Sequence, residues 1–402
     1  MLLNRLRSRT RRHLVARVDI LVAACAIAST TSTAYPQSAA NDWLGKKVFV
    51  KDTAHPRVGN QTFEWNAVSI PATVSKVEGN YLWLGSAWVT PNEVVTLDDA
   101  PAHFTDVMAR RPNEAWPYLL RAVAWNLKRD YKNAIKDFDE AIRREPGVAM
   151  VYRARAQTYH AMGEYQKALD DLDETIRLNP RMAIAYNDRG ATLNELDEYQ
   201  KAYEQLNEAL RLDPKLALAY YNRGSNWHDQ KQYDKALADF NQAIALDPKL
   251  AIAYDGRGYT YSRQANYGKA AQDFEMSIKL APHEPWGYLN FARMWATADS
   301  EGPLDGARAV EAATKACELS NWNDWICVAT LAAAYAETGD FDKAIEWQNR
   351  AIKLDVRPEH KDKVNALERL ELYKAHKPYR EKATPPAVPM PSDDAADEKP
   401  EA

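Results

Sequence analysis

The sequence lacks the short motifs that mark common catalytic and cofactor sites. It contains no HExxH, CxxC, GxSxG, Walker loop or GxGxxG pattern, so metalloproteases, thiol redox centres, serine hydrolases and nucleotide-binding enzymes are not indicated. The eight histidines are scattered, and a lone histidine on a helix is usually a polar surface residue. We therefore expect neither catalysis nor a bound metal or cofactor.

The sequence also lacks an excess of one charge and any long apolar run. Lys and Arg total 52 while Asp and Glu total 56, which argues against nucleic acid or an anionic lipid surface as the main partner. Outside the N-terminus, no segment approaches the roughly 20 apolar residues that a membrane span needs. We expect contact with a membrane only through the N-terminal segment, if it stays uncleaved.

The first 34 residues depart from the even charge balance. Removing them changes the formal charge from −4 to −9, because six arginines between Arg5 and Arg17 face a single acid, Asp19. A short apolar run, Ile20 to Ala28, is followed by small residues that end at Ala34. This order is typical of a bacterial export signal. We predict cleavage after Ala34 or after Ala40, and an extracytoplasmic protein that is periplasmic, envelope-associated or secreted.

Other targeting interpretations of this segment stay open. Arginine-rich segments poor in acids also occur as organelle transit peptides. Thr10-Arg11-Arg12 weakly resembles a twin-arginine signal, and Val22 to Cys25 weakly resembles a lipoprotein cleavage box. The apolar stretch before Cys25 is too short for the lipoprotein interpretation.

Cysteine is scarce, with three in the chain. If Cys25 leaves with the signal, Cys317 and Cys327 remain, and an even pair in an oxidising compartment is a disulfide candidate. The alternative is two small buried thiols.

Proline, by contrast, recurs with a fixed period. Six prolines stand 34 residues apart: Pro112, Pro146, Pro180, Pro214, Pro248 and Pro282. With proline as position 32, position 4 is Tyr118, Tyr152, Tyr186, Tyr220, Tyr254 and Tyr288. Position 8 is Ala122, Ala156, Gly190, Gly224, Gly258 and Ala292. Position 20 is alanine from Ala134 to Ala270, and position 24 is Phe or Leu. This pattern resembles the tetratricopeptide (TPR) repeat family of bacterial exported type.

The resemblance implies a mainly α fold, an α-solenoid of about seven helix hairpins over residues 115–356. Small residues at positions 8 and 20 let the two helices of a hairpin approach, and proline ends the second helix. The sixth unit carries five inserted residues around Ser300 to Pro303, and the seventh begins near Trp325. Residues 359–376, with Val364, Leu367, Leu370 and Tyr373 on one stripe, should form a capping helix.

Helical periodicity is absent from residues 41–99. Short β-branched and aromatic runs separated by Gly, Asn and Pro predict about five strands and a small all-β barrel. The run from Ala87 to Val95 resembles the last strands of SH3-like modules. Residues 100–114, in register with later second helices, should form a lone half-repeat that joins barrel and solenoid. Residues 381–402 are too polar and proline-rich to fold, and we predict a disordered tail.

One charged pattern recurs within the repeats. Position 7 is Arg121, Arg155, Arg189, Arg223 and Arg257, while position 23 is Asp137, Asp171, Gln205, Asp239 and Asp273. These positions flank the contact between positions 8 and 20, so we predict a structural ladder of Arg to Asp bridges.

The family resemblance implies a concave ligand groove lined by positions 2, 5, 6, 9, 12 and 13 of the first helices. The polar residues so selected are Arg153, Gln157, His160, Asn187, Asn194, Tyr221, Asn222, Ser225, His228, Asp255, Tyr259, Arg263 and Arg293. Such a surface can pair with an extended backbone. The Lys and Asn pattern with which some family members grip a C-terminal carboxylate is absent.

Two functions compete on this evidence. The first is a non-catalytic exported scaffold that binds a peptide or protein segment in the groove. In the second, the β-module tethers the protein to the cell envelope by binding cell-wall glycan or peptide through Trp65, Trp83 or Trp88, and the solenoid is a spacer.

Overall fold

The computed structural model of the chain describes residues 43–51, 54, 57–58, 61–62, 71–78, 81–84, 88–299, 302, 304–354 and 361–381. The predicted export signal and residues 382–402 of the predicted tail lie outside the described residues. The chain divides into two compact units, one ending at Pro180 and the other beginning at Arg181.

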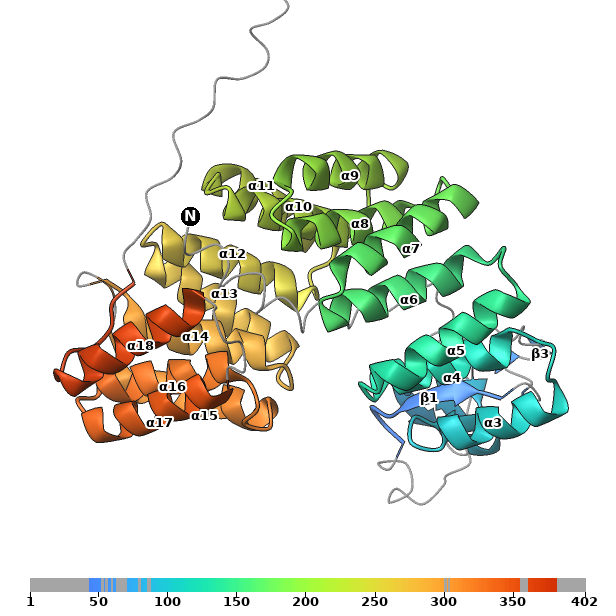
Figure 1. The fold of residues 1–402 in the computed structure, drawn as a ribbon, viewed down its shortest axis with the longest axis horizontal. Coiled ribbons are helices and arrows are strands. Elements are labelled where there is room, and N and C mark those ends of the chain that lie inside the picture. The colour runs from blue at the N-terminus through green and yellow to red at the C-terminus, as the bar shows by residue number, and fades with distance from the viewer. Residues whose placement is uncertain are drawn as a thin grey trace, which may run out of the picture. The chain divides into compact units, whose positions relative to one another are not determined.

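Sixteen helices account for most of the described residues, and consecutive helices pair as hairpins. In the first unit they are α3 (Ala100–Arg110), α4 (Trp116–Leu127), α5 (Tyr131–Arg144), α6 (Ala149–Met162) and α7 (Tyr165–Leu178). In the second unit they are α8 (Ala183–Glu195), α9 (Tyr199–Leu212), α10 (Ala217–Asp229), α11 (Tyr233–Leu246), α12 (Ala251–Arg263), α13 (Tyr267–Leu280), α14 (Pro285–Thr297), α15 (Gly306–Leu319), α16 (Trp325–Glu337), α17 (Phe341–Leu354) and α18 (Lys361–Lys374). The predicted α-solenoid of helix hairpins is confirmed (Figure 1).

Small residues set the close approach within each hairpin, as the sequence predicts. A Cβ added at Gly190 on α8 would lie 2.6 Å from Leu206 Cγ and 3.2 Å from the Ala202 carbonyl oxygen on α9. Ala202 and Leu206 are fully buried and occupy positions 20 and 24 of that repeat. The helices are therefore too close at this column for a side chain without displacement.

The turn inside each of the first five hairpins uses a left-handed residue. Gly163 has φ 79°, while the equivalent Arg129, Asp197, Lys231 and Ala265 have φ between 59° and 62°. This backbone conformation is disfavoured for residues with a Cβ. The packing of the two helices therefore holds a strained turn at four of these five positions.

The N-terminal module is all β, as predicted. Its strands are β1 (Lys47–Val50), β2 (Arg57–Val58), β3 (Gln61–Thr62), β4 (Ala72–Thr73), β5 (Lys76–Glu78), β6 (Tyr81–Trp83), β7 (Trp88–Val89) and β8 (Val94–Thr96), with a 3₁₀ turn at Pro91–Glu93. They form two antiparallel sheets, in the orders β4-β1-β8 and β3-β2-β7-β6-β5. The β-branched run from Ala72 to Val77 is divided between β4 and β5. The aromatic run from Phe63 to Trp65 lies outside the described residues.

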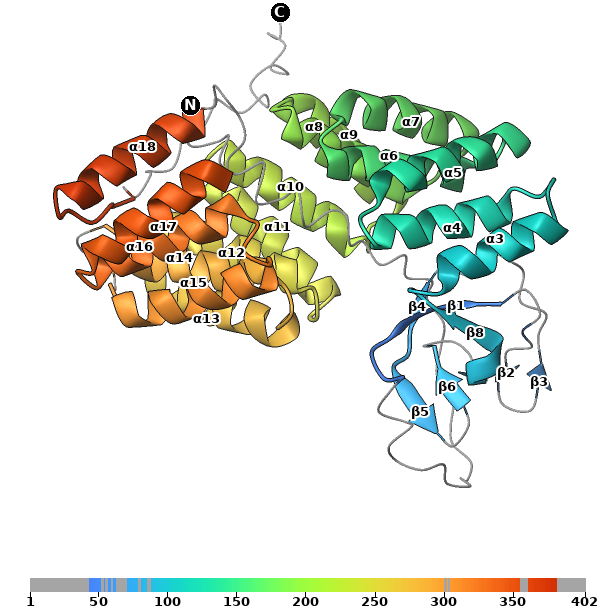
Figure 2. The same ribbon diagram turned by 60° about the horizontal axis from the view of Figure 1, so that its bottom comes forward.

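Helix α3 packs between the β-module and the first hairpin (Figure 2). Phe104 on α3 contacts Phe49 on β1 edge to face, with ring centroids 5.5 Å apart. The same buried cluster includes Val95 on β8 and Leu120 on α4. The predicted half-repeat therefore shares a core with both neighbours.

The irregular units of the second half also follow the sequence. Helix α14 ends at Thr297 and α15 begins at Gly306, so the predicted insertion lies between them. Helix α18 packs on α17 and buries Ala366, Leu370 and Tyr373. The predicted apolar stripe is wrong at Leu367, which is 48% exposed. The buried face of α18 instead includes Ala366, which precedes Leu370 by four residues, and Tyr373 follows three residues later.

The predicted Arg to Asp ladder is confirmed as a structural feature. Four of the arginines donate Nε and Nη2 to both oxygens of their aspartates, at 2.7 to 2.8 Å, in the pairs Arg121–Asp137, Arg155–Asp171, Arg223–Asp239 and Arg257–Asp273. The Nη1 atom reaches back to the preceding repeat, as from Arg223 to Asn207 Oδ1 at 2.6 Å. Each such arginine fixes the contact within a hairpin and between hairpins.

Candidate functional site

The predicted groove residues divide between the two units. Arg153, Gln157 and His160 belong to α6 in the first unit, and the other ten belong to α8, α10, α12 and α14 in the second. Arg153 and His160 are almost fully buried, and the His160 ring lies 5.3 Å from that of Tyr165. Both side chains are therefore largely closed to solvent.

Several predicted groove residues of the second unit bond to one another across neighbouring repeats. Asn222 Nδ2 donates to Asn187 Oδ1 at 2.8 Å, and Asn194 Nδ2 donates to the Asn222 carbonyl at 3.3 Å. Asn226, which the groove positions do not include, donates to Asn194 Oδ1 at 2.6 Å. The amides of α8 and α10 thus connect successive repeats instead of standing open to a ligand.

His228 and its neighbours continue this polar seam. Its Nδ1 lies 2.8 Å from Thr260 Oγ1, and its ring stacks on Tyr259 with centroids 5.0 Å apart. His228 and Ser225 are both buried, 3% and 2% exposed. These side chains stabilise the contact between α10 and α12.

Asp255 is a buried carboxylate on α12. Asn290 Nδ2 on α14 donates to its Oδ2 at 2.8 Å, while Oδ1 has no hydrogen-bond partner among the described residues. Burial raises the pKa of Asp255 to about 7, an effect that the Asn290 bond partly opposes and the charge of Asp273 reinforces.

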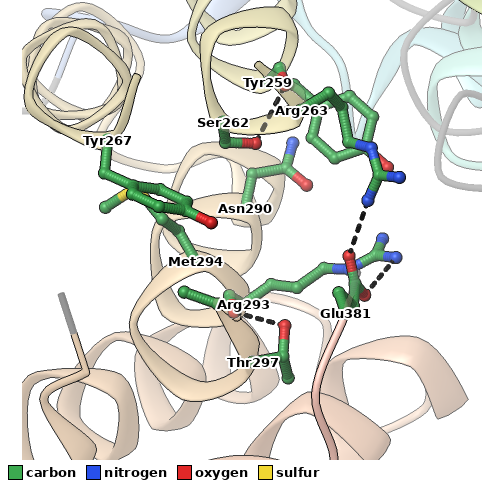
Figure 3. A pocket seen from close by; sticks show the side chains of 10 residues that line it. Tyr259, Ser262, Arg263, Tyr267, Asn290, Arg293, Met294, Thr297 and Glu381 are labelled. Carbon is green, nitrogen blue, oxygen red and sulfur yellow. Dashed lines mark hydrogen bonds and ion pairs between the residues drawn. The ribbon is translucent and has the colours of Figure 1, made fainter. Parts of the chain in front are cut away.

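Three predicted residues line a pocket between α12 and α14 (Figure 3). Tyr259 and Arg263 come from α12, and Arg293 comes from α14. The pocket has an empty volume of about 360 Å³, part of which is open to solvent, and its other lining residues are Ser262, Tyr267, Asn290, Met294, Thr297, Ala298 and Glu381. Here three residues of the predicted groove face an open space.

The pocket already holds a peptide segment of the same chain. The Glu381 amide donates to the Thr297 carbonyl oxygen at 2.6 Å. The Glu381 carboxylate lies between the guanidinium groups of Arg293, at 2.5 Å, and Arg263, at 3.5 Å (Figure 3). Main chain and side chain of one residue are therefore both recognised.

The charges of this group are strongly coupled. Burial acts to raise the pKa of Glu381, but the charges of Arg293, Arg369 and Arg263 outweigh it and lower the pKa. The reciprocal attraction raises the pKa of Arg293 although burial opposes it. Burial and the bond to Asp299 raise the pKa of Tyr267 to about 12. At neutral pH the pocket therefore contains a carboxylate and a neutral phenol.

Glu381 is the main residue that sequence reasoning missed, since the predicted disordered tail begins at this residue. The structure instead places Glu381 in the pocket, with 10% of its side chain exposed. No column of the repeat could identify it, because it lies beyond the array. Thr297, at position 13 of the sixth repeat, belongs to a groove column and could have been found.

Cys317 and Cys327 are free, buried thiols in one apolar cluster. The structure has no disulfide between them, which corresponds to the alternative of two small buried thiols. Burial raises the pKa of Cys317 to about 12, and burial also raises the pKa of Cys327 well above its ordinary value. Both thiols therefore resist ionisation at neutral pH.

Of the three tryptophans proposed for glycan binding, the structure describes the side chain of Trp88. Trp65 lies outside the described residues, and Trp88 is partly buried with Lys76 Nζ 5.9 Å from its ring centroid. The described core of the module is aliphatic, built around Val48, Leu82 and Val89. The envelope-tether function, including the role of Trp83, stays a prediction.

Metal-ligand clusters and membrane-spanning helices are both absent from the described residues. No group of three metal-ligating side chains occurs within residues 43–381 where the structure describes them. No described helix has the length and apolarity needed to cross a membrane.

Comparison with known proteins matches three segments of the chain to tetratricopeptide repeat models. The matched residues are 153–217, 217–250 and 329–355. No curated protein sequence matches the chain.

Solved structures match parts of the chain at low identity, and two of them, with TM-scores of 0.54 and 0.50, share its fold. The APC/C hetero-tetramer Cut9-Hcn1 has 16% identity and a TM-score of 0.54, with 68% of this chain and 52% of that chain covered. Yeast Tom70 has 17% identity and a TM-score of 0.50, with 69% and 59% covered. MamA has 24% identity and a TM-score of 0.34, with 40% of this chain and 94% of that chain covered.

Proposed function

The chain is a tetratricopeptide repeat protein, a protein-interaction scaffold, and we propose that it binds an extended peptide segment of a partner protein in the pocket between α12 and α14. Proteins of this family bind peptide or protein partners, and their helices supply side chains for an extended backbone. The observation that carries the proposal is the main-chain bond from Glu381 to the Thr297 carbonyl. It indicates that the main chain of a peptide segment fits this surface.

The proposed binding site lies at the fifth and sixth repeats and not at the third and fourth. The amides of Asn187, Asn194 and Asn222 bond to one another, so a ligand would have to break these contacts. Tyr259, Arg263 and Arg293 line a pocket with open space, and the residue that holds the two arginines there, Glu381, comes from beyond the repeats. Recognition at the fifth and sixth repeats leaves the bonds between the third and fourth intact.

A non-catalytic role is part of the proposal. The pocket has no nucleophile paired with a base, since its polar groups are two arginines, one glutamate, an amide and hydroxyls. Arginines held by a carboxylate suit binding and orientation.

Site-specific photo-crosslinking tests the proposal. A photoreactive residue replaces Ser262, which lines the pocket, and a matched control replaces Glu275, which is exposed on α13. We expect one partner to crosslink at position 262 and not at 275, and an excess of uncrosslinked partner segment to abolish it. Equal crosslinking at both positions would reject the pocket as the binding site.

We also propose that the protein acts outside the cytoplasm. The support is the arginine-rich start followed by a short apolar run and Ala34. The test is N-terminal sequencing of the chain recovered from the envelope or periplasmic fraction. A start at Tyr35 or Asn41 is expected. Recovery of the chain from the cytosol with its original N-terminus would contradict export.

A further inference from the structure

The segment after α18 follows a defined path back to α14 and α16. His376 has φ 54°, and its ring stacks on Phe341 at 5.1 Å. Tyr379 packs on the apolar cluster of α14 to α18, with the Arg369 guanidinium 4.1 Å from its ring centroid. Arg380 pairs with Glu337 at 2.6 Å. These contacts position the next residue, Glu381, in the pocket.

Glu381 is recognised in a way that a free anion could not be. Its carboxylate forms ion pairs with Arg263 and Arg293, while its main-chain amide donates to the Thr297 carbonyl oxygen. A phosphate or acetate ion at neutral pH offers no comparable amide donor for that carbonyl. The pocket therefore fits an acidic residue within an extended peptide.

The arginines of the pocket differ from those of the structural ladder. The ladder arginines occupy position 7 of their repeats and pair with an aspartate of the same hairpin. Arg263 and Arg293 occupy positions 13 and 9, on the face of the groove, and share a carboxylate that lies 118 and 88 residues away. Removing that carboxylate would leave buried cationic groups that attract another acid.

Resting on the proposed function, we propose that the pocket is a recognition site for an acidic side chain of the partner segment, and that Glu381 occupies it in cis as an autoinhibitory ligand. A partner binds by displacing Glu381. Since the two ligands compete, the apparent affinity for the partner is lowered by the fraction of molecules in which Glu381 is docked. The partner segment must contain an Asp or Glu in an extended stretch, and the main-chain amide of that acidic residue must be free to donate a hydrogen bond.

The test uses the full chain and a labelled synthetic peptide that copies residues 376–384, capped at both ends. A second peptide carries Gln in place of the residue equivalent to Glu381. The variants are Glu381→Gln and Glu381→Arg, the latter because its charge repels Arg263 and Arg293 and undocks the segment. The matched control is Glu371→Gln, since Glu371 is exposed on α18 and pairs only locally with Lys374.

We expect Glu381→Arg and Glu381→Gln to bind the acidic peptide at least about tenfold more tightly than the wild-type chain. The control should bind it as the wild type does. The Gln peptide should bind at least about tenfold more weakly than the acidic peptide, because the pair with the arginines is lost. Adding Arg293→Gln to Glu381→Gln should remove binding of the acidic peptide.

The outcomes separate this inference from the proposed function. If both peptides bind the two variants equally, the pocket holds a peptide without acidic selectivity, and this inference fails while the proposed function stands. If the variants bind the acidic peptide no better than the wild type does, cis occupation is rejected. If neither peptide binds any folded variant, the pocket is not a peptide site and both proposals are rejected.

Discussion

Arg223 on α10 and Asp239 on α11 form a two-point ion pair, with Nε to Oδ2 and Nη2 to Oδ1 both at 2.8 Å. Their side chains are 21% and 9% exposed. The third arm of Arg223 donates to Asn207 on α9. One side chain therefore sets both the geometry of its hairpin and the register of the preceding one.

Replacing this arginine should destabilise the second unit. In Arg223→Ala the Asp239 carboxylate keeps its buried position without a partner, which costs up to roughly 3 to 5 kcal/mol. Arg211→Ala, which breaks an exposed pair with Glu208 (68% and 32% exposed), should cost less than about 1 kcal/mol. Thermal and urea unfolding of both variants provide the measurement. Equal losses would show that the ladder is only a surface feature.

The close contact at Gly190 predicts that Gly190→Ala, which adds a methyl group, destabilises the protein. Gly190→Ala improves helix propensity by about 1 kcal/mol, but its Cβ meets Leu206 Cγ at 2.6 Å. Overpacking of this kind costs about 1 to 3 kcal/mol, so the net result should be a lower free energy of unfolding.

Gly268→Ala is the matched control for Gly190→Ala. Gly268 lies within helix α13, and an added Cβ there meets nothing within 4 Å. It should therefore gain stability of up to about 1 kcal/mol from propensity alone. Urea midpoints that move in the same direction for both variants would contradict the packing argument.

The left-handed turns predict a stabilising substitution. Ala265 has φ 59° and is exposed, so Ala265→Gly relieves backbone strain of about 1 kcal/mol without removing a packed side chain. The reverse change, Gly163→Ala at φ 79°, should destabilise by a similar amount. Melting temperatures measured under one condition test the pair. A lower melting temperature for Ala265→Gly would refute the strain argument.

Asp255 predicts a pH-dependent stability. Its folded pKa of about 7 lies above the ordinary value of 3.8, so the folded state prefers the protonated acid. The associated stability is complete below about pH 4 and is lost as pH rises to about 7, by at most roughly 4 kcal/mol.

Asp255→Asn removes this titration while an amide oxygen can still accept from Asn290. The difference in melting temperature between variant and wild type should grow in favour of the variant between pH 5 and 8. Because variant and wild type share all other titrating groups, the difference between them isolates Asp255. One of these groups is Glu381, whose lowered pKa makes stability fall as pH decreases below 4.5. A difference that does not change with pH would contradict the assignment.

Much of the fold follows from local chemistry that the sequence displays. The prolines end the second helices because they cannot donate to a continuing helix, and α5, α7, α9, α11 and α13 each end two residues before one. The ladder could be predicted as well, because both partners lie in one hairpin, 16 residues apart. The left-handed turns were not predicted, since only Gly163 among these five positions is a glycine.

The candidate site was predictable only in part. The columns of the repeat placed Tyr259, Arg263 and Arg293 on one face, and the structure brings them to one pocket. The same columns selected Asn187, Asn222 and Asp255, which bond to neighbouring repeats. A column identifies a face of a helix, but whether its side chains meet a neighbour or a ligand depends on the spacing between hairpins.

The sequence by itself determined the repeat unit, its length and the residues that close each hairpin, because these are contacts between residues near in the chain. Only the tertiary structure decided that Glu381 returns to Arg293 and Arg263, 88 and 118 residues earlier. That return depends on the packing of α18, His376 and Tyr379 against the last hairpins. No periodicity encodes it, since the segment lies beyond the repeats and is positioned by contacts that exist only after they have stacked.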